Sequence, residues 1–140
     1  AAKRIKSGLF AVVGTSGTTN FGIVDRLDEI AKACKQLGVW FHVDGAYGLA
    51  GILDPRQKKL FKGAEKADSF IVDPHKWLFT TFDSCALVYR NPKLAALAHT
   101  QHGEYLDTLT DSGEFNPSDY AYHLTRRARG LPVAQPSAIP

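Results

Sequence analysis

Four short runs of apolar residues predict four β-strands. The first run, LFAVV at residues 9–13, is continuous and lies between two glycines, as expected for a strand buried on both faces. The second, VWFHV at 39–43, is rich in the β-branched and aromatic residues that favour strands. The third and fourth runs are SFIV at 69–72 and CALVY at 85–89.

The segment between the first two runs has the hydrophobic spacing of a helix. Apolar residues recur every three or four positions from Ile23 to Leu37, which predicts an amphipathic helix. Asp25 is placed to cap its first turn, and Gly38 to end it in the left-handed conformation. Shorter helices are predicted at residues 56–62, 92–98 and 118–129, and residues 99–117 have the composition of a polar, irregular loop.

The order of these elements is typical of an α/β protein. Strand, helix, strand, short helix and strand in succession predict a mostly parallel sheet with helices on both faces. Residues 73–84 leave little room for a helical crossover, so the fourth strand is expected to run antiparallel. The 140 residues correspond to one domain.

Composition and charge exclude several functions. Apolar residues make up 44% of the chain and charged residues 22%, which is typical of a soluble globular protein. No apolar run has the length of a membrane-spanning helix, and a net charge of +3 without a Lys/Arg block indicates no nucleic-acid partner. Cys34 and Cys85 have the spacing of neither a metal site nor a disulfide framework. Cys34 is expected to be a buried free thiol, which favours a reducing cytoplasm.

Polar residues of the types found in catalytic and binding sites follow three of the predicted strands. Gly14–Thr19 follows the first, Asp44 follows the second, and Asp73-Pro74-His75-Lys76 follows the third. Because ligands of open α/β sheets bind at the carboxyl ends of the strands, these groups are expected to share one site. Each has a simpler interpretation when taken alone: a flexible loop, a helix cap, a core histidine and a lysine that reaches solvent. The glycine-rich turn fits neither the P-loop nor the dinucleotide fingerprint, which argues against a nicotinamide enzyme.

Lys76 and Asp44 taken together indicate a cofactor. Lys76 stands between His75 and Trp77 in a stiff, apolar stretch, and desolvation favours the neutral amine that forms Schiff bases. A Schiff-base lysine with an aspartate on the pyridinium nitrogen is the recognition pair for pyridoxal 5′-phosphate (PLP). The carboxylate keeps the ring nitrogen protonated, so the ring can accept the electron pair of a breaking bond at the substrate Cα. We therefore expect a PLP site in which Lys76 is the Schiff-base lysine and Asp44 lies buried behind the ring.

Three motifs extend this interpretation to a family. HVDGAYG at 42–48, DPHKW at 73–77 and GTSGTTNFGIVD at 14–25 resemble motifs of the group II PLP-dependent decarboxylases, which include the aromatic-L-amino-acid, histidine and glutamate decarboxylases. The similarity covers about residues 9–131 and keeps the order and spacing of the motifs. It implies the large PLP-binding domain of the aspartate-aminotransferase-like fold (fold type I). It further implies α-decarboxylation of an L-amino acid by a cytoplasmic homodimer.

The resemblance also implies roles for single residues. Ala46 matches the small residue against the ring face, Thr19 the threonine at the cofactor site, and His75 the histidine that helps to hold the phosphate. Asp73 occupies a position that is often Asn near the phosphate, where an acid would repel the phosphate unless a cation offset it. Tyr105, in the polar loop, matches the tyrosine that protonates Cα after CO2 leaves. No metal site is expected.

The same resemblance suggests that the chain is one piece of a larger enzyme. Residues 1–132 correspond to the central portion of the PLP-binding large domain, and residues 133–140 to an atypical, truncated tail. The ring-stacking histidine and the small C-terminal domain of the family have no counterpart here, so the isolated fragment is expected to be inactive. Two other interpretations stay open: a non-catalytic fragment, and another PLP reaction such as transamination, desulfuration or aldol cleavage.

Overall fold

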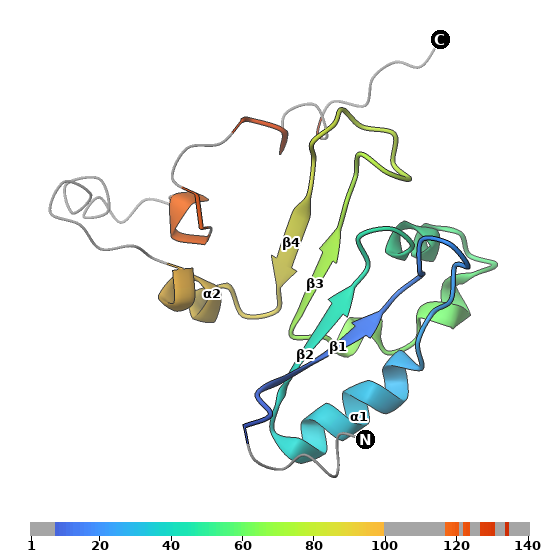
Figure 1. Ribbon diagram of the computed structural model, residues 1–140, viewed down its shortest axis with the longest axis vertical. Helices are drawn as coiled ribbons and strands as arrows, with labels where there is room; N and C mark the ends of the chain where they lie inside the picture. Colours follow the sequence, from blue (N-terminus) through green and yellow to red (C-terminus); the bar gives the residue numbers. More distant parts are fainter. Residues whose placement is uncertain (1–7, 100–116, 121, 124–126, 131–133, 135–140) are drawn as a thin grey trace, which may run out of the picture. The chain divides into compact units, whose positions relative to one another are not determined.

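A computed structural model describes residues 8–99, 117–120, 122, 123, 127–130 and 134 of the chain (Figure 1). The chain divides into two compact units, one of residues 1–90 with 129–140 and one of residues 91–128. The first unit contains a four-stranded sheet, and the strands follow one another across it in chain order. The segments with candidate chemistry, apart from the loop of Tyr105, belong to this first unit.

The sheet has the predicted topology. Its strands are β1 (Ala11–Thr15), β2 (Trp40–Asp44), β3 (Ser69–Val72) and β4 (Ala86–Tyr89). The first three are parallel, and β4 is antiparallel to β3, as the arrows in Figure 1 show. The mostly parallel α/β fold and the antiparallel fourth strand are therefore confirmed.

Strand β1 runs past the glycine that was expected to end it. Gly14 lies inside the strand, opposite Val43 of β2. A Cβ atom on Gly14 would come within 3.0 Å of the Leu27 side chain and 3.2 Å of the Phe41 side chain, so glycine leaves room for both against the strand. This glycine is a packing residue rather than the start of a turn.

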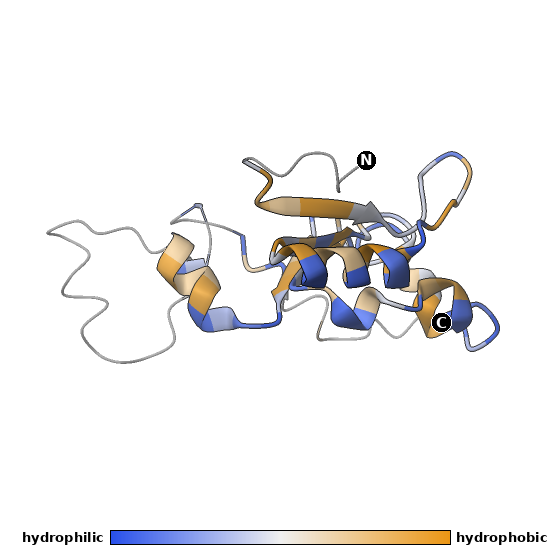
Figure 2. Cartoon of the chain, turned by 90° about the horizontal axis from the view of Figure 1, so that it is seen from below, coloured by the Kyte–Doolittle hydropathy of each residue, from blue (hydrophilic) through white to orange (hydrophobic). Residues whose placement is uncertain are grey.

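Helix α1 (Leu27–Leu37) covers one face of the sheet and forms the core with it. Figure 2 shows the helix along that face. The buried residues of this core, which include Ala67 just after η4, are Leu27, Ala31, Cys34, Phe41, Val43 and Ala67. Cys34 is a free thiol that is 2% exposed, as predicted, and burial together with the Asp68 charge raises its pKa. The opposite face is less covered, since Val13 is 60% exposed.

The end of α1 lies where the sequence predicts it, but the start of α1 lacks the predicted cap. Gly38 ends the helix with φ of 64°, as predicted. The predicted cap at Asp25 is wrong, because no side chain caps the helix and the Asp25 carboxylate accepts a hydrogen bond of 2.7 Å from the Thr15 N–H. Asp25 therefore joins the start of the helix segment to the end of β1.

The crossover from β2 to β3 is built from 3-10 turns. They are η2 (Leu49–Leu53), η3 (Lys58–Phe61) and η4 (Ala64–Lys66), so the helix predicted at 56–62 is reduced to one 3-10 turn. Gly63 has φ of 103°, and a Cβ there would lie 2.3 Å from the Asp28 main chain. That close approach fixes the crossover against the first turn of α1.

The second unit contains α2 (Pro92–His99) and the 3-10 turn η5 (Pro117–Tyr120). Helix α2 is where the sequence predicts a helix. The helix predicted at 118–129 is wrong for the described residues, because 122, 123, 127 and 128 are not helical. Tyr122, one of the described residues of this segment, is 82% exposed. Among the described residues, no helix is long and apolar enough to cross a membrane.

Candidate active site

The carboxyl ends of β1, β2 and β3 meet at one rim of the sheet. The Ser16 N–H donates to the Asp44 carbonyl at 2.7 Å, which joins the glycine-rich turn to the end of β2. The Asp73 N–H donates to the Ala46 carbonyl at 3.2 Å, which continues the pairing of β2 and β3 beyond the strands. All three candidate segments are therefore linked by main-chain hydrogen bonds, as expected from a parallel sheet.

Two glycines bring the first two segments into direct contact. A Cβ on Gly17 would lie 2.6 Å from the Gly48 Cα, and a Cβ on Gly48 would lie 2.5 Å from the Gly17 Cα. Gly17 also has φ of 94°, which disfavours other residues. The glycine-rich turn is thus held by main-chain packing against the HVDGAYG segment.

Lys76 and Asp73 form an ion pair at this rim. Lys76 Nζ lies 2.7 Å from Asp73 Oδ2, and the two side chains are 34% and 12% exposed. The Lys76 N–H also donates to the Asp73 carbonyl at 3.0 Å, so the residues sit at the two ends of one turn. Sequence analysis did not predict this pair, although the spacing of three residues allows it.

The surroundings keep the Asp73 carboxylate charged. Burial raises its pKa, but the Lys76 ammonium, the Cys85 thiol and His75 outweigh that effect, so the pKa of Asp73 is lowered overall. The other oxygen, Oδ1, is buried and has no hydrogen-bond partner within the part of the chain that the structure describes. The Asp73 carboxylate is therefore paired with one cation, Lys76, through Oδ2.

Cys85 is a neighbour of the site that sequence analysis missed. The residue as a whole is exposed, yet its thiol lies beside the Asp73 carboxylate. Partial burial and then that carboxylate raise the pKa of Cys85 to about 11. The antiparallel pairing of β3 and β4 brings Cys85 here, and only a correct strand register could have identified it.

His75 is fixed by the main chain of the β3–β4 loop. Its Nδ1 lies within hydrogen-bonding distance of Ser84, whose N–H is 3.1 Å away. The ring also packs edge-on against Phe82, with 4.9 Å between the ring centroids. Since Nδ1 is engaged, Nε2 is the nitrogen left for another partner.

Asp44, Ala46 and Thr19 lie at the same rim but do not contact Lys76 in any hydrogen bond of the structure. Asp44 Oδ1 accepts from the Ala46 N–H at 3.2 Å, and the Asp44 side chain is exposed rather than buried. Thr19 is exposed in the turn closed by the bond from the Gly22 N–H to the Thr18 carbonyl. Tyr105 falls outside the described residues.

A hydrogen-bonded cluster lies on the same sheet face as Asp44. Trp40 Nε1 donates to the Ser69 hydroxyl at 2.9 Å, and His42 Nδ1 lies 2.8 Å from the same oxygen. Burial lowers the pKa of His42, and the Asp44 charge opposes this only in part. The cluster ties the middle of β2 to β3 just before Asp44.

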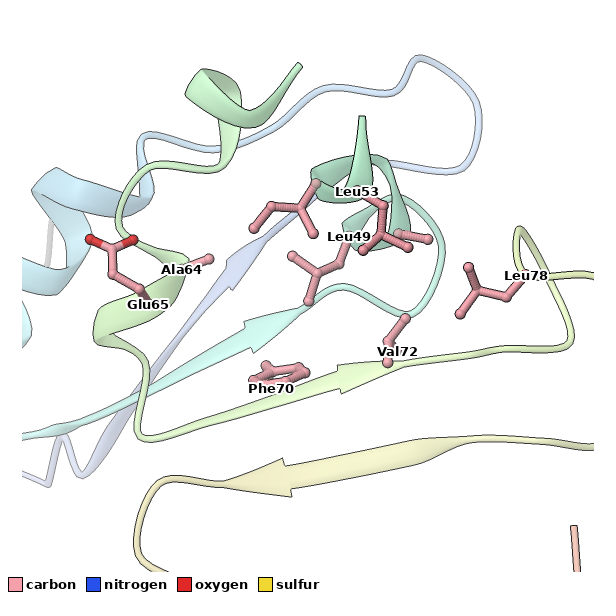
Figure 3. Close-up of a pocket in the computed structure, with 9 residues that line it drawn as sticks. Leu49, Leu53, Ala64, Glu65, Phe70, Val72 and Leu78 are labelled. Carbon is pink, nitrogen blue, oxygen red and sulfur yellow. The ribbon is translucent and has the colours of Figure 1, made fainter. Parts of the chain in front are cut away.

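A cavity between η2 and β3 has a different character from the polar rim. It has a volume of about 330 Å³ and is almost wholly apolar, and its lining residues are Leu49, Ala50, Ile52, Leu53, Ala64, Glu65, Phe70, Val72 and Leu78. Figure 3 shows the side chains of η2 facing those of β3 across it. It offers no amine and no cluster of ionisable groups, so the predicted chemistry belongs to the polar rim. Among the described residues, no group of His, Cys, Asp or Glu side chains could hold a metal ion.

The fold and the rim define an α/β ligand-binding domain with a lysine amine and two carboxylates at the strand ends. Residues 2–131 match the family described as the pyridoxal-dependent decarboxylase conserved domain. The chain therefore belongs to the pyridoxal-dependent decarboxylase family.

Individual relatives agree with this assignment. The chain is 39% identical to an aromatic-L-amino-acid decarboxylase of Bacillus atrophaeus, over 89% of this chain and 26% of that protein. It is 37% identical to a phenylacetaldehyde synthase of a Rosa hybrid cultivar, over 88% of this chain and 24% of that protein. The structure of Oryza sativa TDC with PLP and tryptamine matches 89% of this chain and 26% of its own, with 32% identity and a TM-score of 0.80. The chain thus spans about a quarter of the length of these relatives.

The residues present fit pyridoxal phosphate. An aldehyde needs an amine that it can reach, and the Lys76 side chain is 34% exposed. A pyridinium nitrogen needs a carboxylate, and that of Asp44 is exposed at the same rim. Both groups are held on segments that main-chain hydrogen bonds join, so their relative placement is built into the sheet.

Proposed function

We propose that this chain is the central portion of the PLP-binding large domain of an L-amino-acid α-decarboxylase, with residues 1–132 in that domain and 133–140 as an atypical tail. We refer to the whole protein as the complete enzyme. The observation that carries the proposal is the lysine amine at the carboxyl end of β3, on a rim whose main chain links it to Asp44. The family match and a relative that is an aromatic-L-amino-acid decarboxylase support the choice of reaction.

Bound PLP supplies an electron sink for the pair of electrons released when the bond from Cα to the carboxylate breaks. Lys76 is the residue that holds the cofactor covalently through its amine and gives way to the amine of the substrate. Asp44, the last residue of β2, would keep the ring nitrogen protonated. Ala46 is small enough to lie against the ring face, and its N–H already orients the Asp44 carboxylate at 3.2 Å.

Two further residues hold the phosphate end in this proposal. His75 presents Nε2, because the Ser84 main chain occupies Nδ1. Thr19 offers a hydroxyl from the exposed turn after β1. Tyr105 is assigned the proton that returns to Cα after CO2 leaves, on the resemblance of its loop to that of the decarboxylases. We expect the complete enzyme to be a cytoplasmic homodimer.

The substrate is an L-amino acid, and the relatives suggest an aromatic one first. The decarboxylase of Bacillus atrophaeus carries that substrate class in its name. The relative from the rose cultivar is instead a phenylacetaldehyde synthase, so an aldehyde product is the specific second candidate. Transamination, desulfuration or a non-catalytic role of the fragment are the remaining alternatives.

Product analysis tests the proposal. The complete enzyme, supplied with PLP and single L-amino acids, is expected to release CO2 and the matching amine in equal amounts. An aldehyde, released with CO2, ammonia and hydrogen peroxide while dissolved oxygen is consumed, would select the second candidate. A keto acid without CO2 would refute decarboxylation. A matched pair of variants, Tyr105→Phe and Tyr120→Phe, tests which residue returns the proton to Cα. Only Tyr105→Phe is expected to lose amine formation.

A further inference from the structure

Asp73 has the features of a counter-ion rather than of a phosphate ligand. Its Oδ2 lies 2.7 Å from Lys76 Nζ, and its side chain is 12% exposed. Its Oδ1 is buried without a hydrogen-bond partner among the described residues. A phosphate dianion beside this carboxylate would be repelled by its negative charge. The acid expected near the phosphate is thus occupied by the lysine amine.

The pair is held by the local fold as well as by charge. The Asp73 N–H donates to the Ala46 carbonyl at 3.2 Å, so the acid is anchored to the segment after β2. The Lys76 N–H donates back to the Asp73 carbonyl at 3.0 Å, and Pro74 between them is buried. The ionisable groups that act on the carboxylate are Lys76, His75 and Cys85, and only the lysine contacts it as a cation.

We propose that Asp73 is a positioning residue that holds the Lys76 side chain in an ion pair until the cofactor arrives, and that it does not bind the phosphate. This inference rests on the proposed function, because it concerns the lysine assigned to the cofactor. An ammonium has no free electron pair, so it must lose its proton before it attacks an aldehyde. The ion pair with the Asp73 carboxylate, 2.7 Å from Nζ, must also break before the amine reaches the aldehyde, so the pair slows capture at neutral pH.

The experiment compares two aldehydes that differ only in the phosphate. Cofactor-free complete enzyme is mixed with PLP or with pyridoxal, and borohydride reduces the imine on Lys76 to a stable secondary amine. Mass spectrometry of the Lys76 peptide then gives the rate of capture for native enzyme, Asp73→Asn and the control Asp83→Asn. Asp83 is an acid of the same loop that pairs with Arg129, 2.9 Å away, rather than with Lys76.

We expect Asp73→Asn to capture both aldehydes faster by the same factor, about tenfold near pH 7, the lower end of what a hydrogen bond between charged groups contributes. The factor should shrink toward one at high pH, where the amine is neutral in both proteins. Asp83→Asn should match native enzyme. A gain with PLP alone would place Asp73 at the phosphate and overturn the inference, as would a loss or no change with both aldehydes.

A second variant keeps the test decisive if Asp73→Asn fails to fold. Asp73→Glu retains the charge, so its capture rates should stay within about twofold of native enzyme. A tenfold rise in that variant would refute the role of the charge. Native enzyme that captures neither aldehyde on Lys76 would refute the proposed function and this inference together. Capture on Lys76 with no effect of Asp73→Asn would refute this inference alone.

Discussion

The contact between Gly17 and Gly48 holds the glycine-rich turn against the segment of Asp44, and Gly48→Ala tests it. The added Cβ would lie 2.5 Å from the Gly17 Cα and 2.7 Å from the Ser16 carbonyl oxygen, whereas ordinary contacts begin at 3.4 Å. Something must therefore move by about 0.9 Å, the difference between 3.4 and 2.5 Å. Both neighbours are main-chain atoms of a segment bonded to Asp44 at 2.7 Å, so neither yields easily.

Overpacking of this kind costs about 1–3 kcal/mol, and the rigidity of both segments favours the upper half, about 2–3 kcal/mol. In the complete enzyme, whose relatives are about four times as long as this chain, that loss lowers the melting temperature by roughly 2–3 °C, at about 2.1 cal/mol/K of unfolding entropy per residue. Thermal denaturation of the complete enzyme without cofactor, followed by circular dichroism, measures the shift. Gly130→Ala is the control, because a Cβ there meets nothing within 4 Å. Equal melting temperatures for the two variants would refute the close approach of the two segments.

Three further predictions concern single groups. Burial lowers the pKa of His42, so the unfolded state binds a proton there more readily than the folded state. The free energy of unfolding should therefore fall as the pH drops through about 6.5. Denaturant titrations should show a smaller fall for His42→Gln. Cys85 should react with iodoacetamide about tenfold more slowly than a thiol with a pKa of 9.0. Its pKa, raised to about 11, lowers the thiolate fraction about a hundredfold, and the greater nucleophilicity of that thiolate recovers about tenfold of this. Reaction at the rate of a free thiol would contradict this prediction. Asp25→Ala should cost about 1 kcal/mol because the Thr15 N–H loses its acceptor, and an unchanged unfolding midpoint would argue against that bond.

The sheet was predictable because its signals are local and strong. Continuous apolar runs bounded by turns identify buried strands, and a connection as short as 73–84 permits only an antiparallel return. Gly38 was equally clear, since glycine is favoured where a helix ends in the left-handed conformation. The convergence of Asp44 and the Asp73–Lys76 turn on one rim then follows from the geometry of parallel strands.

The details that escaped prediction depend on contacts between distant residues. Gly14 reads as a turn in the sequence, and only the approach of Leu27 and Phe41 shows why it lies in a strand. Asp25 is a residue type that often caps helices, but its carboxylate accepts a hydrogen bond from the Thr15 N–H instead. Cys85 reaches Asp73 only through the register of β3 and β4. The helix expected at 118–129 has the right residue types but exposes Tyr122.

The central claim is that Lys76 is the lysine that binds the cofactor. The most direct measurement is borohydride reduction of the complete enzyme loaded with PLP, followed by mass spectrometry of its peptides. We expect the reduced cofactor on the peptide that carries Lys76, and we expect it to be lost in Lys76→Ala. The control Lys66→Ala, whose lysine lies in the crossover turn η4, should retain it. Reduced cofactor on another lysine of the native enzyme, or its persistence on this peptide in Lys76→Ala, would contradict the assignment.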